Sequence, residues 1–188
     1  MSFYQVSADE ANFQIITLDA MTLFEQLDLG DSGLIDCVNL GISDVSFAGK
    51  WGDVVTEFAP SPLHPAASAL PDITIWQNGC FVISDYADAC LKDILAPLGE
   101  RLPITISGNP YYLYNILAIA QIAPEKSEFE WQGDEPVDAN KLCIEPESAE
   151  GKDLFKASLH GYGGLFCTAG FKETCEEFDL KGLLFSPC

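Results

Sequence analysis

The sequence predicts an α+β fold with a mostly antiparallel sheet and two related hairpin–helix units. First, the apolar runs DITIW and CFVI flank residues 77–79 (Gln-Asn-Gly), and two apolar runs around Asn-Gly are typical of a β-hairpin. Second, the next residues place Ala87, Leu91 and Leu95 at helical spacing. Third, the order strand, turn, strand and helix recurs over residues 153–178. One supersecondary unit is therefore expected twice.

The two units align at a constant offset along the chain. The matched pairs are Gly79 with Gly164, Phe81 with Phe166, Tyr86 with Phe171, Asp88 with Glu173 and Cys90 with Cys175. Upstream, Asp72-Ile73 matches Asp153-Leu154 if a short insertion separates the two parts. The turn HGYGG, which is longer than Gln-Asn-Gly, accounts for that insertion.

Residues that can cap helices precede each helical run. Asp19 precedes residues 20–28, Ser84 precedes the run that Pro97 ends, and Thr168 precedes the last helix. Hydroxyl and carboxylate oxygens at this position accept hydrogen bonds from N–H groups of the first helical turn. The sequence therefore predicts three helices that begin after these residues.

Further strands are expected at residues 3–6 and 13–18, within the glycine-punctuated stretch 33–58, at LPITISG and at the closing GLLF. The run NPYYLYNIL could be a helix or a strand, and its aromatic and β-branched residues favour a strand. Residues 125–153 hold ten carboxylates and three lysines. We expect solvated loops and edges there, with at most short strands.

A domain boundary is expected near PSPLHPAASALP, which has four prolines in residues 60–71. The predicted parts are an N-terminal α/β lobe, residues 1–68, and a C-terminal domain, residues 69–188. The alternative is that the lobe belongs to the same domain.

Charge is the most pronounced property of the chain, with 29 acidic and 9 basic residues and a formal net charge of −20. This charge repels nucleic acid and anionic membranes and disfavours phosphate-bearing substrates. It attracts basic proteins, so we expect a basic partner, with solubility or a salt-rich habitat as the alternative. No apolar stretch of about 18 residues and no signal-peptide pattern occur in the sequence, which favours a cytoplasmic protein without a membrane span.

One segment, KDLFKASLHGYGGLFCTAGFKETCEEF, combines His160, Cys167 and a glycine-rich turn like a catalytic site. In the aligned units, however, Cys167 lies within a strand, and the glycines supply a hairpin turn. The seven cysteines form no CxxC pair, and no histidine stands at ligand spacing. We therefore expect unbridged thiols, no metal, no cofactor and no catalytic residue. A small enzyme is the alternative.

The ending TAGFKETC (168–175) followed by LKGLLFSP (180–187) resembles the immunity proteins of bacterial polymorphic toxin systems. Their last helix has the form SERFKEAxE and is followed by LxGLxFxP. The segments LPDITIW…GCFVISDYADACL and NPYYLYNIL…PEKSEF are also similar, so the resemblance covers residues 70–187. It implies a cytoplasmic protein that binds a cognate toxin domain and blocks it. The alternatives are an enzyme acting on the toxin or its product, and an acidic nucleic-acid-mimic binding protein.

The partner-binding surface is expected in the acidic segment 125–153. It combines dense carboxylates with a tryptophan, a residue type enriched at interface hot spots. The candidate residues are Trp131, Asp134, Glu135, Asp138, Glu145 and Glu147. A solvated connector is the alternative reading of this segment. The N-terminal third, with ten acids and one lysine, is the rival surface. The oligomeric state stays open.

Overall fold

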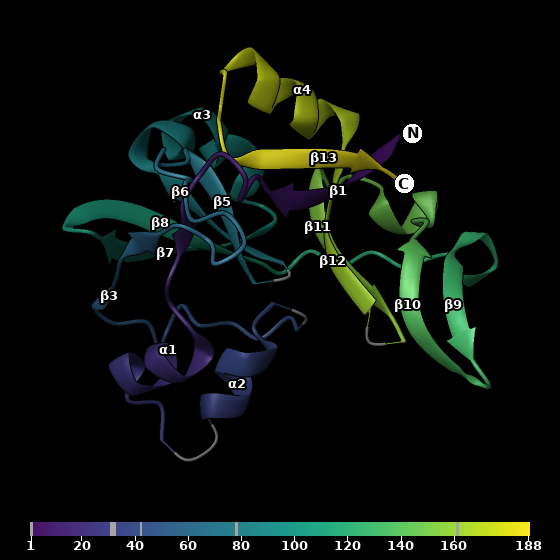
Figure 1. The fold of residues 1–188 in the computed structure, drawn as a ribbon, viewed down its shortest axis with the longest axis horizontal. Coiled ribbons are helices and arrows are strands. Elements are labelled where there is room, and N and C mark those ends of the chain that lie inside the picture. Colours follow the sequence, from purple (N-terminus) through teal and green to yellow (C-terminus); the bar gives the residue numbers. More distant parts are fainter. Residues whose placement is uncertain (1, 31–32, 42, 78, 161) are drawn as a thin grey trace.

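A computed structural model describes residues 2–30, 33–41, 43–77, 79–160 and 162–188 (Figure 1). The helices are α1 (Ala20–Leu27), α2 (Gly33–Asn39), α3 (Asp85–Leu95) and α4 (Ala169–Glu177), with 3-10 turns η1 (Pro124–Lys126) and η2 (Pro146–Ala149). The strands are β1 (Phe3–Ala8), β2 (Ile15–Ile16), β3 (Val54–Thr56), β4 (Phe58–Ala59), β5 (Ile73–Gln77), β6 (Cys80–Ser84), β7 (Gly99–Ile106), β8 (Asn109–Ile116), β9 (Glu128–Gln132), β10 (Glu135–Lys141), β11 (Leu154–Leu159), β12 (Tyr162–Thr168) and β13 (Leu183–Pro187).

The strands form two large sheets and two small ones. The first large sheet has the order β3-β7-β8-β6-β5, and the second has the order β11-β12-β1-β13. Strands β9 and β10 pair with each other, as do β2 and β4. Among the described pairs of named strands, β3 with β7 is parallel and the others are antiparallel. The expected α+β fold with mostly antiparallel sheets is thus confirmed.

The two hairpin–helix units are β5-β6-α3 and β11-β12-α4. Both helices begin at the predicted caps, because Ser84 Oγ accepts from Ala87 N and Thr168 Oγ1 accepts from Phe171 N. These caps correct the alignment of the units by one residue. Cys167 corresponds to Ile83 and Cys175 to Leu91, and all four side chains are buried in one core. Residues 78 and 161 of the predicted turns lie outside the described part of the chain.

The core of the molecule lies where these two units meet. Side chains from β5, β6, β8 and α3 pack there against side chains from β1, β11, β12 and α4. The rings of Phe81 and Tyr114 stack in this core with their centroids 5.5 Å apart. A second core lies between the opposite face of the five-stranded sheet and the helices α1 and α2. A third joins the four-stranded sheet to residues 118–149.

The structure corrects two local expectations. Residues 33–39 form helix α2 instead of a strand, because Gly33, Cys37 and Leu40 are buried at helical spacing. Residues 128–141 form a hairpin whose strands are five and seven residues long, where loops with at most short strands were expected.

The run NPYYLYNIL is a strand, β8, as favoured. No described helix has the length and apolar character needed to cross a membrane.

Strands from residues 1–68 and 69–188 share the two large sheets. Strand β1 lies between β12 and β13, and β3 pairs with β7. This pairing favours the alternative in which the N-terminal residues belong to the same domain. The division near residue 68 itself stays a prediction.

Candidate partner-binding surface

The hairpin β9–β10 carries four of the six residues predicted to bind a partner. Trp131 lies in β9, Asp134 in the turn, and Glu135 and Asp138 in β10. Pro136 is the register partner of Trp131, and Asp138 is that of Glu130. The hairpin forms a small sheet of its own at one side of the molecule, next to β11 and β12 (Figure 1). Its position therefore leaves much of it open to a partner.

Trp131 belongs to a cluster of three rings. Its centroid is 6.0 Å from that of Phe129 and 5.8 Å from that of His160, and the latter two are 5.5 Å apart. Phe129 is half-buried against the third core, while Trp131 is 52% exposed. His160 reaches the cluster from the end of β11, where its backbone has φ 54°. The contacts hold the indole in place and leave half of it uncovered, as an interface anchor requires.

The charges around this cluster are almost all negative. Glu128, Glu130, Asp134 and Glu135 are exposed, and Lys141 is the cation of the hairpin strands. Ion pairs among the described side chains join Lys50 to Asp36, Arg101 to Asp88, Lys172 to Glu176 and Lys181 to Asp179, all outside the hairpin. The hairpin thus offers carboxylates that a basic surface could pair with.

Glu145 and Glu147 lie apart from the tip of the hairpin. They belong to the η2 region beyond the last residue of β10, whereas Asp134 is in the turn before its first residue. A strand of this length spans about 20 Å. Glu145 is half-buried, and its backbone bonds to Gln121 and Ser148. The six predicted residues therefore fall into two groups. Trp131, Asp134, Glu135 and Asp138 lie on the hairpin, and Glu145 and Glu147 lie beyond its base.

His160 and Phe129 are the members of the surface that the sequence did not single out as binding residues. His160 was assigned only to a turn, and its neighbour Trp131 is far away in sequence. In the fold, the residue after β11 lies beside the hairpin, and the His160 ring contacts Phe129 and Trp131 there. The one available signal was the aromatic alternation Phe129–Trp131, which places both rings on the same face of a strand.

Cys167 and His160 do not come together. Cys167 is fully buried in β12 opposite Leu154, and burial raises the pKa of its thiol well above the ordinary value. His160 precedes β12 and is exposed. His160 and Cys167 are therefore separated by about 20 Å of extended chain. Among the described residues, no group of three or more His, Cys, Asp or Glu side chains is arranged to hold a metal ion.

The rival surface in the N-terminal third also exposes apolar side chains. Met21 on α1, and Ile35 and Val38 on α2, are at least half exposed. Their neighbour Asp36 is already paired with Lys50 at 3.1 Å. This surface is acidic and partly apolar. Its exposed apolar side chains named here are aliphatic, whereas Trp131 is an exposed aromatic ring that two other rings hold in place.

Comparison with known proteins adds no relative. The chain matches no protein-family model, and a search of curated proteins found no significant match.

Proposed function

We propose that this protein is a cytoplasmic immunity protein that binds a cognate toxin domain of a bacterial polymorphic toxin system and blocks it by occlusion. The support is the resemblance of residues 70–187, the charge of −20 and the hairpin β9–β10. The observation that carries most weight is the half-exposed Trp131 held between Phe129 and His160, next to the exposed carboxylates of Glu128, Glu130, Asp134 and Glu135, none of which forms an ion pair with a described side chain.

The chemistry of the hairpin suits a toxin with a basic cleft, such as a nuclease. Carboxylates compete with phosphate groups for lysine and arginine side chains, so an acidic hairpin can occupy a phosphate-binding cleft. Opposite net charges also steer the two proteins together and raise the association rate. Trp131 would supply the buried apolar contact that slows dissociation.

The test measures binding of the toxin domain encoded beside this gene. Trp131→Ala should weaken binding at least about 30-fold, mainly through faster dissociation, because a hot-spot tryptophan contributes about 2 kcal/mol or more. Joint reversal of Asp134, Glu135 and Asp138 to lysine should slow association about tenfold or more at low salt and flatten its salt dependence.

The control reverses three exposed carboxylates elsewhere, Asp93 on α3 and Glu173 and Glu177 on α4, none of which has an ion-pair partner among the described side chains. It changes the net charge equally, so it should alter association much less. Equal effects of both triple variants would show that only total charge matters. Loss of binding in the control alone would move the interface to α3 and α4. Failure of the toxin domain to bind the wild-type protein would overturn the function itself.

A further inference from the structure

One face of the five-stranded sheet is only half covered. Along this face, register and alternation place Val55 of β3 beside Thr105 of β7, and Pro103 of β7 beside Tyr112 of β8. Helix α3 packs over β6 and β8 and reaches Arg101 through Asp88. Beyond Arg101 the face is open. Val55 is 55% exposed, and Pro103 is exposed as well.

Two adjoining hollows lie here. The first is on the open half of the face, and the second is beside β7, because its lining also includes Glu100 and Leu102, which face the opposite side of the sheet. One, of about 440 Å³, is lined by Val55, Pro110 and Tyr112 among others. The next, of about 470 Å³, is lined by Trp51 and Arg101. Both hollows share the residues Gly52, Asp53 and Pro103, which therefore form the wall between them. The two hollows are therefore continuous, and the lining of this groove includes Pro103, Pro110, Tyr111, Tyr112, Trp51 and Val55.

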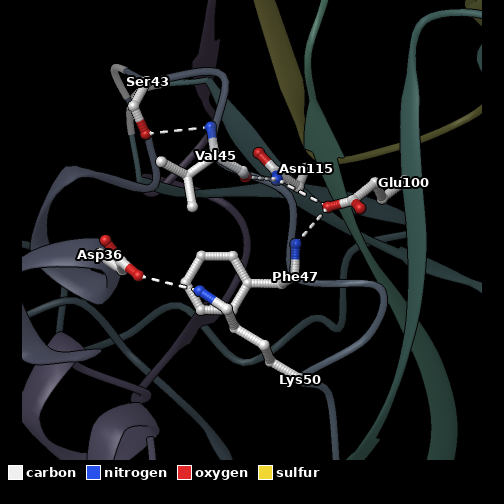
Figure 2. Close-up of polar contacts among 7 residues, drawn as sticks. All are labelled: Asp36, Ser43, Val45, Phe47, Lys50, Glu100 and Asn115. Carbon is white, nitrogen blue, oxygen red and sulfur yellow. Dashed lines mark hydrogen bonds and ion pairs between the residues drawn. The ribbon is translucent and has the colours of Figure 1, made fainter. Parts of the chain in front are cut away.

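The segment that precedes Gly52 and Asp53 is held against the sheet by hydrogen bonds. Glu100 accepts hydrogen bonds from the backbone N–H groups of Phe47 and Ala48, and Asn115 donates to both Glu100 and the carbonyl of Val45. Figure 2 shows the contacts among Val45, Phe47, Glu100 and Asn115 together with the pair Lys50–Asp36. Trp51 then donates its indole N–H to the carbonyl of Pro103 at 2.7 Å. The groove is thus preformed, so an occupant would not have to order it.

Among the described charged residues that line the groove, Arg101 has an ion-pair partner and Glu100 accepts hydrogen bonds, whereas Asp53 has neither kind of partner. The Arg101 guanidinium lies 3.3 Å above the centre of the Tyr112 ring and is bound by both oxygens of Asp88. Its charge is therefore neutralised within the protein. No described residue forms an ion pair or a hydrogen bond with the exposed carboxylate of Asp53. A cationic group on the occupant would complement this position.

The neighbouring sheet edge is closed to an added strand. The outward N–H of Val55 donates to Gln26 Oε1 at 2.7 Å, and the carbonyl of Val55 accepts from Gln26 Nε2 at 2.9 Å. The Gln26 amide thus takes the two hydrogen bonds that a paired strand would make there. An occupant must instead be held by its side chains on the open face.

From this combination we infer that the groove binds an extended, proline-containing basic segment of a partner protein. A polyproline II helix needs no ladder hydrogen bonds from its receptor, and it packs its rings into aromatic-lined hollows. Two hollows in series would take successive proline faces, and Asp53 on the wall between them would pair with a lysine or arginine. This inference does not depend on the proposed toxin partner.

The test titrates the isotope-labelled full chain with a synthetic peptide, Lys-Pro-Pro-Pro-Pro-Pro-Lys, and follows amide shifts by NMR. The control peptide, Lys-Gly-Ser-Gly-Ser-Gly-Lys, has the same length and charge. The proline peptide should shift the amides of Gly52, Val55 and Tyr112 saturably and bind at least about tenfold more tightly than the control, which corresponds to about 1.4 kcal/mol.

Asp53→Lys should weaken binding of the proline peptide at least about tenfold. Glu57→Lys, an equal charge change at an exposed residue outside the groove, should have little effect, and the dispersion of both spectra reports folding. Equal binding of both peptides would show that charge attraction alone explains the binding, and it would overturn the inference. Absence of shifts at the groove would overturn it too. A peptide-independent dimer that buries Val55 would show that a second copy of the chain occupies the face instead.

Discussion

Ser84 and Thr168 make the same hydrogen bonds in the two hairpin–helix units. The N–H of Ser84 donates to the carbonyl of Asp72 at 2.8 Å, and the N–H of Thr168 donates to the carbonyl of Asp153 at 3.0 Å. Each side chain then accepts from the first turn of the following helix. One residue in each unit therefore closes the base of the hairpin and begins the helix that covers the core.

Removing the Thr168 cap should lower the free energy of unfolding more than removing the Ser84 cap, because Thr168 Oγ1 also donates to Asp153 Oδ1 at 2.9 Å. Thr168→Ala should lower the free energy of unfolding by about 1–2 kcal/mol, measured by urea denaturation. Thr168→Ser keeps the hydroxyl and should recover most of the loss. An alanine variant as stable as wild type would mean that Phe171 N–H finds another acceptor.

The contact of Asp88 with Arg101 predicts a pH-dependent contribution to stability. Burial raises the pKa of Asp88, but the hydrogen bonds from Arg101 and Tyr114 outweigh it and hold this pKa below the ordinary value of 3.8. The folded state therefore favours the ionised carboxyl. The resulting stabilisation is complete above pH 3.8 and is lost as the pH falls through the lowered pKa.

Asp88→Asn should accordingly cost about 2 kcal/mol at neutral pH, since hydrogen bonds to a charged group are among the stronger ones. The difference in melting temperature between wild type and variant should shrink as the pH is lowered below 3.8. Asp85→Asn, on the exposed first turn of the same helix, is the control for the loss of one acid. A constant difference across this pH range would contradict the assigned role of the Asp88 carboxylate.

Local signals in the sequence were sufficient for the hairpin–helix units. The alternation of apolar residues and the caps Ser84 and Thr168 depend on neighbours in sequence. Helix α2 was missed because its seven residues are mostly β-branched, polar or glycine, and its helical state depends on burial of Cys37 against distant residues. Burial in tertiary structure overrides such weak local preferences.

The candidate surface was only partly predictable for a related reason. The acidic composition and Trp131 were visible in the sequence, whereas the ring contact with His160 joins two hairpins that are separate along the chain. The distance from Asp134 at the tip to Glu145 at the base depends on the length of β10, which charge composition does not reveal. Density of carboxylates in sequence is therefore a poor guide to a patch in space.

The cysteines predict a graded reactivity. All seven are unbridged, and Cys37, Cys80, Cys167 and Cys175 are buried. Burial raises the pKa of Cys80 and of Cys175 to about 12 and that of Cys37 to about 11, so their thiolate forms are scarce at neutral pH. A disulfide-exchange reagent should titrate at most three thiols in the folded protein and seven in denaturant. Fewer than seven in denaturant would reveal a disulfide.

Among the substitutions considered, we expect replacement of Lys156 to lower the free energy of unfolding most. Its side chain is almost completely buried, and its ammonium donates to the carbonyls of Leu40 and Ser43 at 2.7 and 2.8 Å and to Asn115 Oδ1 at 3.0 Å. These bonds join β11 to the segment after α2 and to β8. Lys156→Met keeps much of the volume but removes the ammonium from all three acceptors. The Cys80 thiol, 3.7 Å from both Leu40 O and Asn115 Oδ1, is a weak donor and can serve only one of them at a time. A buried acceptor without a strong donor costs about 1 kcal/mol or more.

We therefore expect Lys156→Met to lower the free energy of unfolding by about 3 kcal/mol or more in urea denaturation. Amide exchange should also accelerate first around Leu40 and Ser43, because their carbonyls lose the shared ammonium. Lys181→Met is the matched control. Its ammonium pairs with the exposed Asp179, and such surface pairs contribute about 1 kcal/mol at most. If both variants lose the same small amount, water replaces the ammonium at the three acceptors, and the attachment of the segment after α2 must depend instead on the contacts that Glu100 makes with Phe47 and Ala48.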